Sequence, residues 1–311
     1  MAKVIITGVD GNFGSYAANS ILGKVDKKDL IFTSPNKDAL KKYLDMGIDA
    51  RYADYNNAQQ LKDAFHSGDV VLLISLPFVG EKRRRLHKNA IDGAIAAGVG
   101  KIIYTSTVGA GIPENKALVK VDHEYTEDYI WSKGVRWNIL RNSQYAEAMV
   151  ASYDQAAGRD GVLANNHGDG EMALISRNDC AEAAACAAAG AAKDNTIYDI
   201  TGPELVSMQM LVQVGNEVTG QNVIYKFIDD EQMFRHFDSL GIPRTTEGDF
   251  SKAAFPYCSE DMVSYGRAIR LGQMNKLTNH VELLTGRSPR TIREIFMDKE
   301  NFKLGDRTAT E

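Results

Sequence analysis

The sequence predicts an α/β fold: a doubly wound parallel sheet with helices on both faces, and a smaller α/β part after it. Two observations carry this prediction. Short runs rich in Val, Ile and Leu alternate with amphipathic segments through the first half of the chain, as in strands that helices cover on both sides. The chain also begins with an apolar strand that leads into three glycines and then into a helical pattern. Its 311 residues suffice for such a sheet and a second part.

Each strand of the first half is followed by a helical segment. The strands are expected near residues 3–7, 29–33, 49–52, 69–76, 101–106 and 136–141. The helices are expected near residues 13–23, 36–46, 57–66, 81–97 and 117–132. Strands that are connected through helices run parallel in one sheet, so these segments form its body.

After Asn142 the alternation becomes irregular. Short strands are expected near residues 161–165, 171–175 and 196–200. Helices are expected near residues 178–190, 205–219, 259–275, 279–286 and 291–297. No Pro/Ser-rich linker separates the two halves, so the second part is expected to be interwoven with the first rather than tethered to it.

Composition excludes several classes of partner. The formal net charge of -5 argues against nucleic-acid binding. The basic run Lys82–Arg85 is expected to be a solvated helix face, with the steering of an anionic substrate or cofactor as the alternative. Apolar runs such as Val70–Ile74 are far shorter than the roughly 20 residues of a membrane helix. Three cysteines without metal spacing suit a reducing, cytoplasmic setting. The expected partner is a small-molecule substrate, and a homodimer is compatible with the sequence but not specified by it.

The glycine spacing at the start of the chain predicts a dinucleotide site. Gly8 allows a tight turn out of the strand, Gly11 lets the backbone approach a pyrophosphate, and Gly14 lets the next helix pack against the sheet. The helix N-terminus then points its free N–H groups at the phosphates. The cofactor-binding residues expected here are Thr7, Gly8, Asp10, Gly11, Asn12, Phe13 and Gly14.

Further motifs resemble a known family. They are Ala53-Asp54-Tyr55, Ser75-Leu76-Pro77, His123-x-x-x-Glu127, the segment Gly134–Asn142 and Leu284-Thr285-Gly286-Arg287-x-Pro289. With the glycine loop, their order resembles the NmrA-like atypical short-chain dehydrogenase/reductases, in particular the branch of bacterial quinone oxidoreductases and triphenylmethane reductases. The resemblance covers nearly the whole chain. It implies a Rossmann domain that binds NAD(P)H, placed over residues 1–155, and a substrate-binding part over residues 156–311.

Ligands of a doubly wound sheet lie beyond the carboxyl ends of its strands, so the loops there supply the other cofactor residues. The resemblance implies adenine at Asp54 and Tyr55 and the nicotinamide ribose beside the loop after the fourth strand. The end of the second strand lacks an acidic residue, and Ser34, Asn36 and Lys37 can bind a 2′-phosphate, so NADPH is favoured over NADH. The family often carries Arg where Ser34 stands, so a bidentate clamp is missing. Neither metal nor flavin is expected. The remaining cofactor residues are Ser75, Leu76, Pro77, Thr105, Ser106 and His123.

The expected catalytic residues are His123 and Tyr125. Tyr129 and Lys133 fit the Tyr-x-x-x-Lys pair of typical short-chain dehydrogenases. However, Tyr129 lies about 16 Å along a helix that begins near Leu118, at about 1.5 Å per residue, and the reaction centre faces the other end. The family tends to place Lys or His at position 123, near the nicotinamide. His123 either hydrogen-bonds the ribose or substrate, donates a proton, or only pairs with a residue one turn on, Glu127.

Without a Tyr–Lys pair, the expected enzyme is an NAD(P)H-dependent oxidoreductase that transfers hydride to a planar, conjugated molecule of the quinone, dye or enone type. Two alternatives stay open. One is a non-catalytic NAD(P)-sensing regulator of the NmrA type, and the other is a carbonyl or benzylic ether reductase like the isoflavone-reductase relatives. The aromatic segment 227–237 is expected near the substrate, although aromatics at helical spacing are often core residues. The substrate-binding residues expected are Thr107, Asn142, Tyr145 and Phe234.

Overall fold

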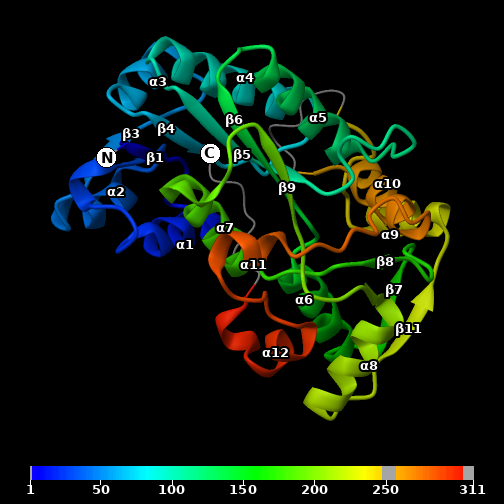
Figure 1. The fold of residues 1–311 in the computed structure, drawn as a ribbon. Coiled ribbons are helices and arrows are strands. Elements are labelled where there is room, and N and C mark those ends of the chain that lie inside the picture. The colour runs from blue at the N-terminus through cyan, green and yellow to red at the C-terminus, as the bar shows by residue number, and fades with distance from the viewer. Residues whose placement is uncertain (1, 247–256, 304–311) are drawn as a thin grey trace.

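A central sheet of parallel strands organises the molecule (Figure 1). The structure is a computed structural model, and it describes residues 2–246 and 257–303. Within that part of the chain the sheet has seven strands in the order β3-β2-β1-β4-β5-β6-β9, and every neighbouring pair is parallel. Their bounds are β1 Val4–Ile6, β2 Leu30–Ser34, β3 Asp49–Tyr52, β4 Val70–Leu73, β5 Lys101–Thr107, β6 Arg136–Asn142 and β9 Thr196–Ile200. The predicted doubly wound parallel sheet is confirmed.

Helices cover both faces of this sheet (Figure 1). On one face lie α3 (Ala58–Phe65), α4 (Glu81–Ala96) and α5 (Leu118–Trp131), and on the other lie α1 (Asn12–Ile21), α2 (Lys37–Asp45), α7 (Arg177–Cys186) and α11 (His280–Thr285). Successive strand residues point to opposite faces. Val4, Ile6 and Ile103 therefore pack towards α1 and α7, whereas Ile5 and Tyr104 pack towards α4 and α5.

The sheet order brings the loops after β1 and β4 together. β1 pairs with β2 on one side and with β4 on the other, so the strand order reverses between β1 and β4. The helices that follow these two strands lie on opposite faces, which leaves a crevice at the carboxyl edge. Thr7 links the ends of β1 and β4 at this point. Its hydroxyl donates to the Leu72 carbonyl at 3.1 Å and accepts from the Ile74 N–H at 3.0 Å.

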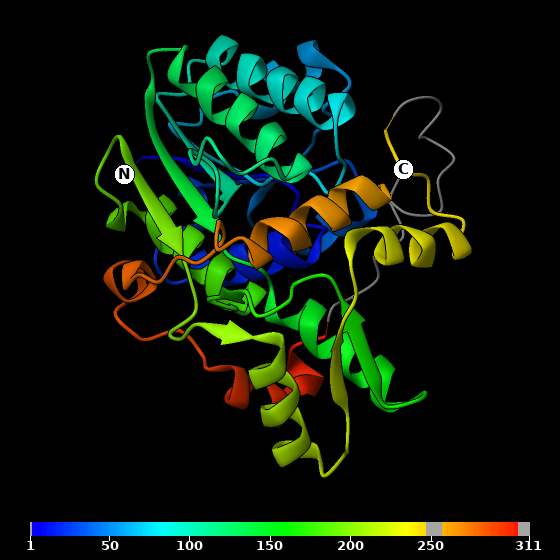
Figure 2. The same ribbon diagram turned by 90° about the vertical axis from the view of Figure 1, so that its right-hand side faces the viewer.

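A second part packs below the carboxyl edge of the sheet (Figure 2). It has its own core, to which α6, α8, α10 and α12 contribute the buried side chains Val150, Leu211, Ile269 and Ile295. Two small sheets join it: β7 pairs with β11 in parallel, and β8 pairs with β10 antiparallel. The bounds are α6 Ala146–Ala157, β7 Val162–Asn165, β8 Glu171–Met172, β10 Val206–Ser207, α8 Met208–Thr219, β11 Ile224–Phe227, α9 Asp230–Ser239, α10 Ser259–Arg270 and α12 Ile292–Met297.

The elements expected in the first half are all present, whereas the second half departs from expectation. The helices α6 and α9 and the strands β10 and β11 are not anticipated by the sequence analysis. The boundary at residue 155 stays a prediction. The chain crosses it, since β9 is the seventh strand of the central sheet and α7 packs against α1. None of the helices in the described ranges is long and apolar enough to cross a membrane.

Candidate functional site

The glycine loop after β1 frames the N-terminus of α1. Gly8 has a φ of 61°, in the left-handed region that favours glycine. A Cβ on Gly14 would lie 1.9 Å from the Gly8 carbonyl oxygen, so this contact between helix and loop requires glycine. A Cβ on Gly11 would meet nothing closer than 3.5 Å, and Gly11 has an ordinary φ of -78°. Packing within the chain therefore requires glycine at position 14. It does not require glycine at position 11, so the missing Cβ there is not explained by contacts within the chain.

The start of α1 fits a phosphate group. Its N-cap, Gly11, supplies no side-chain hydrogen bond, and the first turn holds no acidic residue. The free N–H groups of this turn, on Asn12, Phe13 and Gly14, keep their partial positive charge for a ligand. Two of the helices that follow neighbouring strands differ in this respect, since α2 is capped by Asn36 and α3 by Asn57.

Ser34 and Asn36, two expected phosphate ligands at the end of β2, already accept hydrogen bonds from backbone N–H groups. The Ser34 hydroxyl accepts from the Asn36 N–H at 2.8 Å, and the Asn36 side chain accepts from Asp38 and Ala39 as the cap of α2. Their oxygen atoms are thus oriented, while the Ser34 O–H can still donate. The exposed Lys37 amine lies 4.9 Å from the centre of the Tyr52 ring.

A hydroxyl of β5 holds the start of the loop after β4. The Thr105 hydroxyl accepts from the Ser75 N–H at 2.8 Å and donates to the Ser75 hydroxyl at 3.3 Å. Asp54 accepts from the N–H of Asn56 at 2.9 Å, and the partly buried Tyr55 packs beside it. The expected cofactor residues Asp10, Leu76 and Pro77 also lie in loops at this edge.

His123 lies on α5 and points towards the sheet. Its Nδ1 atom is 2.8 Å from the hydroxyl of Tyr104 on β5, and only 4% of the residue is exposed. Burial, with smaller contributions from Arg83 and His87, holds its pKa well below the usual range. The alternative pairing of His123 with Glu127 is not formed.

Glu127 instead binds two residues of the sheet. Its carboxylate accepts from Arg141 at 3.0 and 2.6 Å, and from the Ser106 hydroxyl at 2.5 Å. The hydroxyl of Ser106 is therefore committed to a side chain of α5. Its expected contact with the cofactor stays a prediction.

The Tyr129–Lys133 pair is engaged at the far end of α5. The Tyr129 hydroxyl donates to Asp92 of α4 at 2.7 Å, and the Lys133 amine donates to Tyr129 at 2.8 Å. Tyr125 stacks on Tyr129 with the two ring planes 3° apart, and Arg84 lies over it. Tyr125 thus faces the outer side of α5, where it is 38% exposed, and does not share the face of His123.

Of the four expected substrate residues, three lie where β5 and β6 end. Asn142 is buried and its Oδ1 atom has no hydrogen-bond partner in the described part of the chain, while its Nδ2 lies 3.3 Å from the Tyr145 hydroxyl. Thr107 ends β5 directly opposite Asn142. An unpartnered buried acceptor at this edge suits a ligand donor. Phe234 lies apart, under Arg244 in the small apolar cluster of α9 and α10.

Four polar residues beside His123 escape the sequence analysis: Arg83, His87, Tyr104 and Asp122. The basic run of residues 82–85 is not a uniformly solvated face, because Arg83 is buried and donates to the Leu76 carbonyl at 3.0 Å. Asp122 accepts from the Gly80 N–H at 2.6 Å. The one sequence signal that could have indicated them is a tyrosine directly after the apolar residues of β5.

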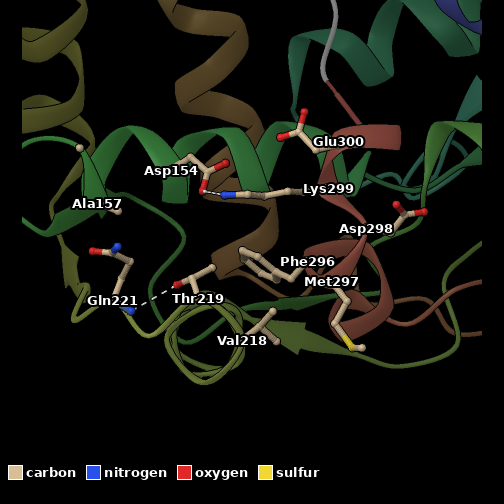
Figure 3. Close-up of a pocket in the computed structure, with 11 residues that line it drawn as sticks. Asp154, Ala157, Val218, Thr219, Gln221, Phe296, Met297, Asp298, Lys299 and Glu300 are labelled. Atoms are coloured by element: carbon tan, nitrogen blue, oxygen red, sulfur yellow. Dashed lines mark hydrogen bonds and ion pairs between the residues drawn. The ribbon is translucent and has the colours of Figure 1, made fainter.

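A cavity of about 710 Å³ lies elsewhere, between α6, α8 and α12 (Figure 3). Asp154, Thr219, Phe296 and Lys299 line it, and Lys299 spans it to Asp154 at 2.9 Å. None of the residues expected to bind cofactor or substrate contributes to it. The residues of the candidate site lie along the carboxyl edge of the sheet, apart from this cavity.

The chain is similar to known NAD(P)H-binding proteins. A family model described as NAD(P)H-binding matches residues 8–189. Quinone oxidoreductase 2 of Escherichia coli is 30% identical over 241 residues, which are 77% of this chain and 82% of that protein. The crystal structure of the NADPH-dependent quinone oxidoreductase of Escherichia coli with NADPH has a TM-score of 0.86 at 26% identity, covering 96% of this chain and 100% of that chain. The triphenylmethane reductase of Citrobacter sp. has a TM-score of 0.82 at 25% identity, covering 96% of this chain and 98% of that chain.

Proposed function

This chain belongs to the NAD(P)H-binding family, and within it to the NmrA-like oxidoreductases, and we propose that it reduces a planar, conjugated small molecule with NADPH. Quinones, triarylmethane dyes and enones are the acceptor class. The observation that carries this proposal is the engagement of Tyr129 and Lys133 by Asp92, at the end of α5 remote from the crevice. The pair on which typical short-chain dehydrogenases rely is thus occupied elsewhere.

Because the Tyr129–Lys133 pair is not available to the reaction, the class of acceptor that can be reduced is restricted. Reduction of an isolated ketone produces a strongly basic alkoxide and calls for a proton donor in the transition state. A quinone, a cationic dye or an enone instead yields a stabilised anion or a neutral product. Such acceptors need chiefly to be held close and correctly oriented, which the walls of the crevice can do.

The residue types at the crevice suit the chemical groups of NADPH. The uncapped first turn of α1 with Gly8 and Gly11 would hold the pyrophosphate, and Ser34 with Lys37 the 2′-phosphate. Asp54 and Tyr55 would flank the adenine, and the loop Ser75–Pro77 the nicotinamide ribose. When bound, NADPH supplies the hydride. The absence of an acid at the end of β2 supports NADPH over NADH.

The chain's own groups then orient the acceptor. Asn142 offers a buried amide at the end of β6, beside Tyr145 and opposite Thr107. His123 lies on α5, beside Tyr104 of β5. We assign these four residues to the acceptor and the nicotinamide ribose, and we leave out Tyr125, which lies on the outer face of its helix. The three buried, unpaired cysteines support a reducing compartment, the cytoplasm, as the place of action.

The test is a titration followed by turnover. NADPH and NADH are added separately while nicotinamide fluorescence is recorded, and absorbance decay of the reduced nicotinamide is then measured with a panel of quinones, dyes and enones. We expect tighter binding of NADPH and acceptor-dependent oxidation. Tight binding without oxidation by any acceptor would overturn the reductase and leave a cofactor-sensing protein.

A further inference from the structure

A line of hydrogen bonds leads from the loop after β4 to His123. The Leu76 N–H lies 3.0 Å from Nε2 of His87 on α4. The Nδ1 atom of His87 lies 3.1 Å from the Thr126 hydroxyl and 3.3 Å from the Tyr104 hydroxyl. The Tyr104 hydroxyl lies 2.8 Å from Nδ1 of His123.

The direction of each bond follows from its first member. A backbone N–H can only donate, so Nε2 of His87 accepts and, in a neutral ring, Nδ1 carries the proton. The Thr126 hydroxyl uses its hydrogen on the Asp122 carbonyl at 3.0 Å and can only accept from His87. The Tyr104 oxygen is the second acceptor for the His87 proton, and the shortest contact of the Tyr104 hydroxyl, at 2.8 Å, directs its O–H to His123. The Nδ1 atom of His123 is therefore an acceptor, and its proton lies on Nε2.

Both rings are buried in their neutral form. His87 and Tyr104 have no exposed surface. Burial, reinforced by Arg83, lowers the pKa of His87 to about 3, and burial also lowers the pKa of His123. Burial raises the pKa of Tyr104, which keeps its hydroxyl protonated. Within the described residues the Nε2 atom of His123 has no hydrogen-bond partner.

We propose that this relay makes His123 a fixed, neutral N–H donor through Nε2, which binds an oxygen of the acceptor or of the nicotinamide ribose and does not release a proton. Tyr104 and His87 are positioning residues, which act through His123. The identity of that oxygen rests on the proposed function, whereas the position of the proton does not. Because the relay starts at the Leu76 amide, one hydrogen-bond network fixes both the loop after β4 and the orientation of the His123 ring on α5.

The direct test is the position of the protons in the protein without ligand. Long-range ¹H–¹⁵N correlation of histidine-labelled protein, assigned with His87→Gln and His123→Gln, distinguishes the two ring nitrogens. We expect the proton of His123 on Nε2 and that of His87 on Nδ1, at pH 7 and unchanged at pH 5.5. A proton on Nδ1 of His123, or a ring that becomes cationic in this range, would overturn the proposal whether or not any acceptor is reduced.

Two pairs of variants test separately the hydrogen-bond network and the role of His123. Tyr104→Phe removes the donor to Nδ1, so His123 should lose its single tautomer, whereas Tyr153→Phe, a buried tyrosine of the second part, should leave the tautomer unchanged. A tautomer insensitive to Tyr104→Phe contradicts the relay. His123→Gln retains an N–H donor near Nε2 and should keep NADPH affinity and kcat/KM within about tenfold, while His123→Ala should lose clearly more. Equal losses in the two variants would identify proton release instead.

Discussion

Arg141 on β6 holds the carboxylate of Glu127 on α5 through two hydrogen bonds, of 3.0 Å from Nε to Oε1 and 2.6 Å from Nη2 to Oε2. Glu127 is 1% exposed, so this ion pair is inside the protein. It joins α5 to the sheet one helical turn beyond His123. The position of His123 beside Tyr104 therefore depends on an ion pair that does not involve His123 itself.

Replacing Arg141 with Met should strongly destabilise the fold. Removing one partner leaves the Glu127 carboxylate buried without compensation, which costs about 3–5 kcal/mol. Arg136→Met is the matched control, because its partner Asp194 is exposed and such surface pairs contribute about 0–1 kcal/mol. Urea unfolding curves of the two variants measure the difference. Equal, small losses would show that the Glu127 carboxylate tolerates isolation.

Gly11→Ala should separate ligand binding from folding. The added Cβ would find its nearest atom at 3.5 Å, and the φ of -78° suits alanine, so the free energy of unfolding should change by less than about 1 kcal/mol. The same Cβ would stand where the pyrophosphate approaches α1. We expect the Kd for NADPH, measured by fluorescence titration, to rise at least about tenfold. Gly158→Ala, in the second part, serves as the control and should leave that Kd unchanged.

Lys37→Ala should weaken NADPH binding selectively. The lysine would supply positive charge to the 2′-phosphate, which NADH lacks, so the Kd for NADPH should rise about tenfold and that for NADH should hardly change. Lys41→Ala removes an equal charge from the same helix, α2, where Lys41 pairs with Asp38. Parallel titrations at one salt concentration compare the two. A similar loss for both dinucleotides would assign Lys37 a role outside the 2′-phosphate.

Tyr129→Phe should leave the reaction intact. The hydroxyl binds Asp92 and Lys133 at the far end of α5, so its removal should change kcat/KM for a quinone by less than about twofold. Its effect should be on stability, at about 1 kcal/mol for one hydrogen-bonding group. Initial rates of NADPH oxidation test this. A loss of a hundredfold or more would restore the Tyr–Lys pair as the proton donor.

Asp261→Asn should change the pH dependence of stability. Burial, with the neighbouring Asp122, raises the pKa of Asp261 to about 6, against the counteracting charge of Arg83. The raised folded-state pKa means that the wild-type protein loses stability as pH rises through 6, by about 1–2 kcal/mol between pH 5 and pH 8. The amide avoids this loss. Unfolding curves should show the variant gaining on the wild type over that range, whereas the exposed Asp38→Asn should show no such trend.

The sequence by itself determined six of the seven strands of the central sheet and the glycine loop after β1. Strand residues such as Ile5 and Ile31 lie in local apolar runs, and Gly8, Gly11 and Gly14 act within one short segment. Local periodicity and glycine spacing carry such information, because backbone conformation and the hydrophobic face are both set by near neighbours. Local reasoning also located Tyr129 and Lys133 correctly. The rise per residue alone puts them at the end of their helix that is remote from the carboxyl edge of the sheet.

Only the tertiary structure decided which polar groups meet. Tyr104, His87 and His123 come from β5, α4 and α5, and they contact one another because two helices pack over one face of one strand. The choice of Glu127 between His123 and Arg141 is likewise a matter of side-chain direction, which residue spacing does not fix. The proton on Nε2 of His123 depends on a backbone N–H 47 residues away in the chain, at Leu76. Hydrogen bonds between distant segments thus set the chemistry of the site, and the sequence pattern contains them only through the fold.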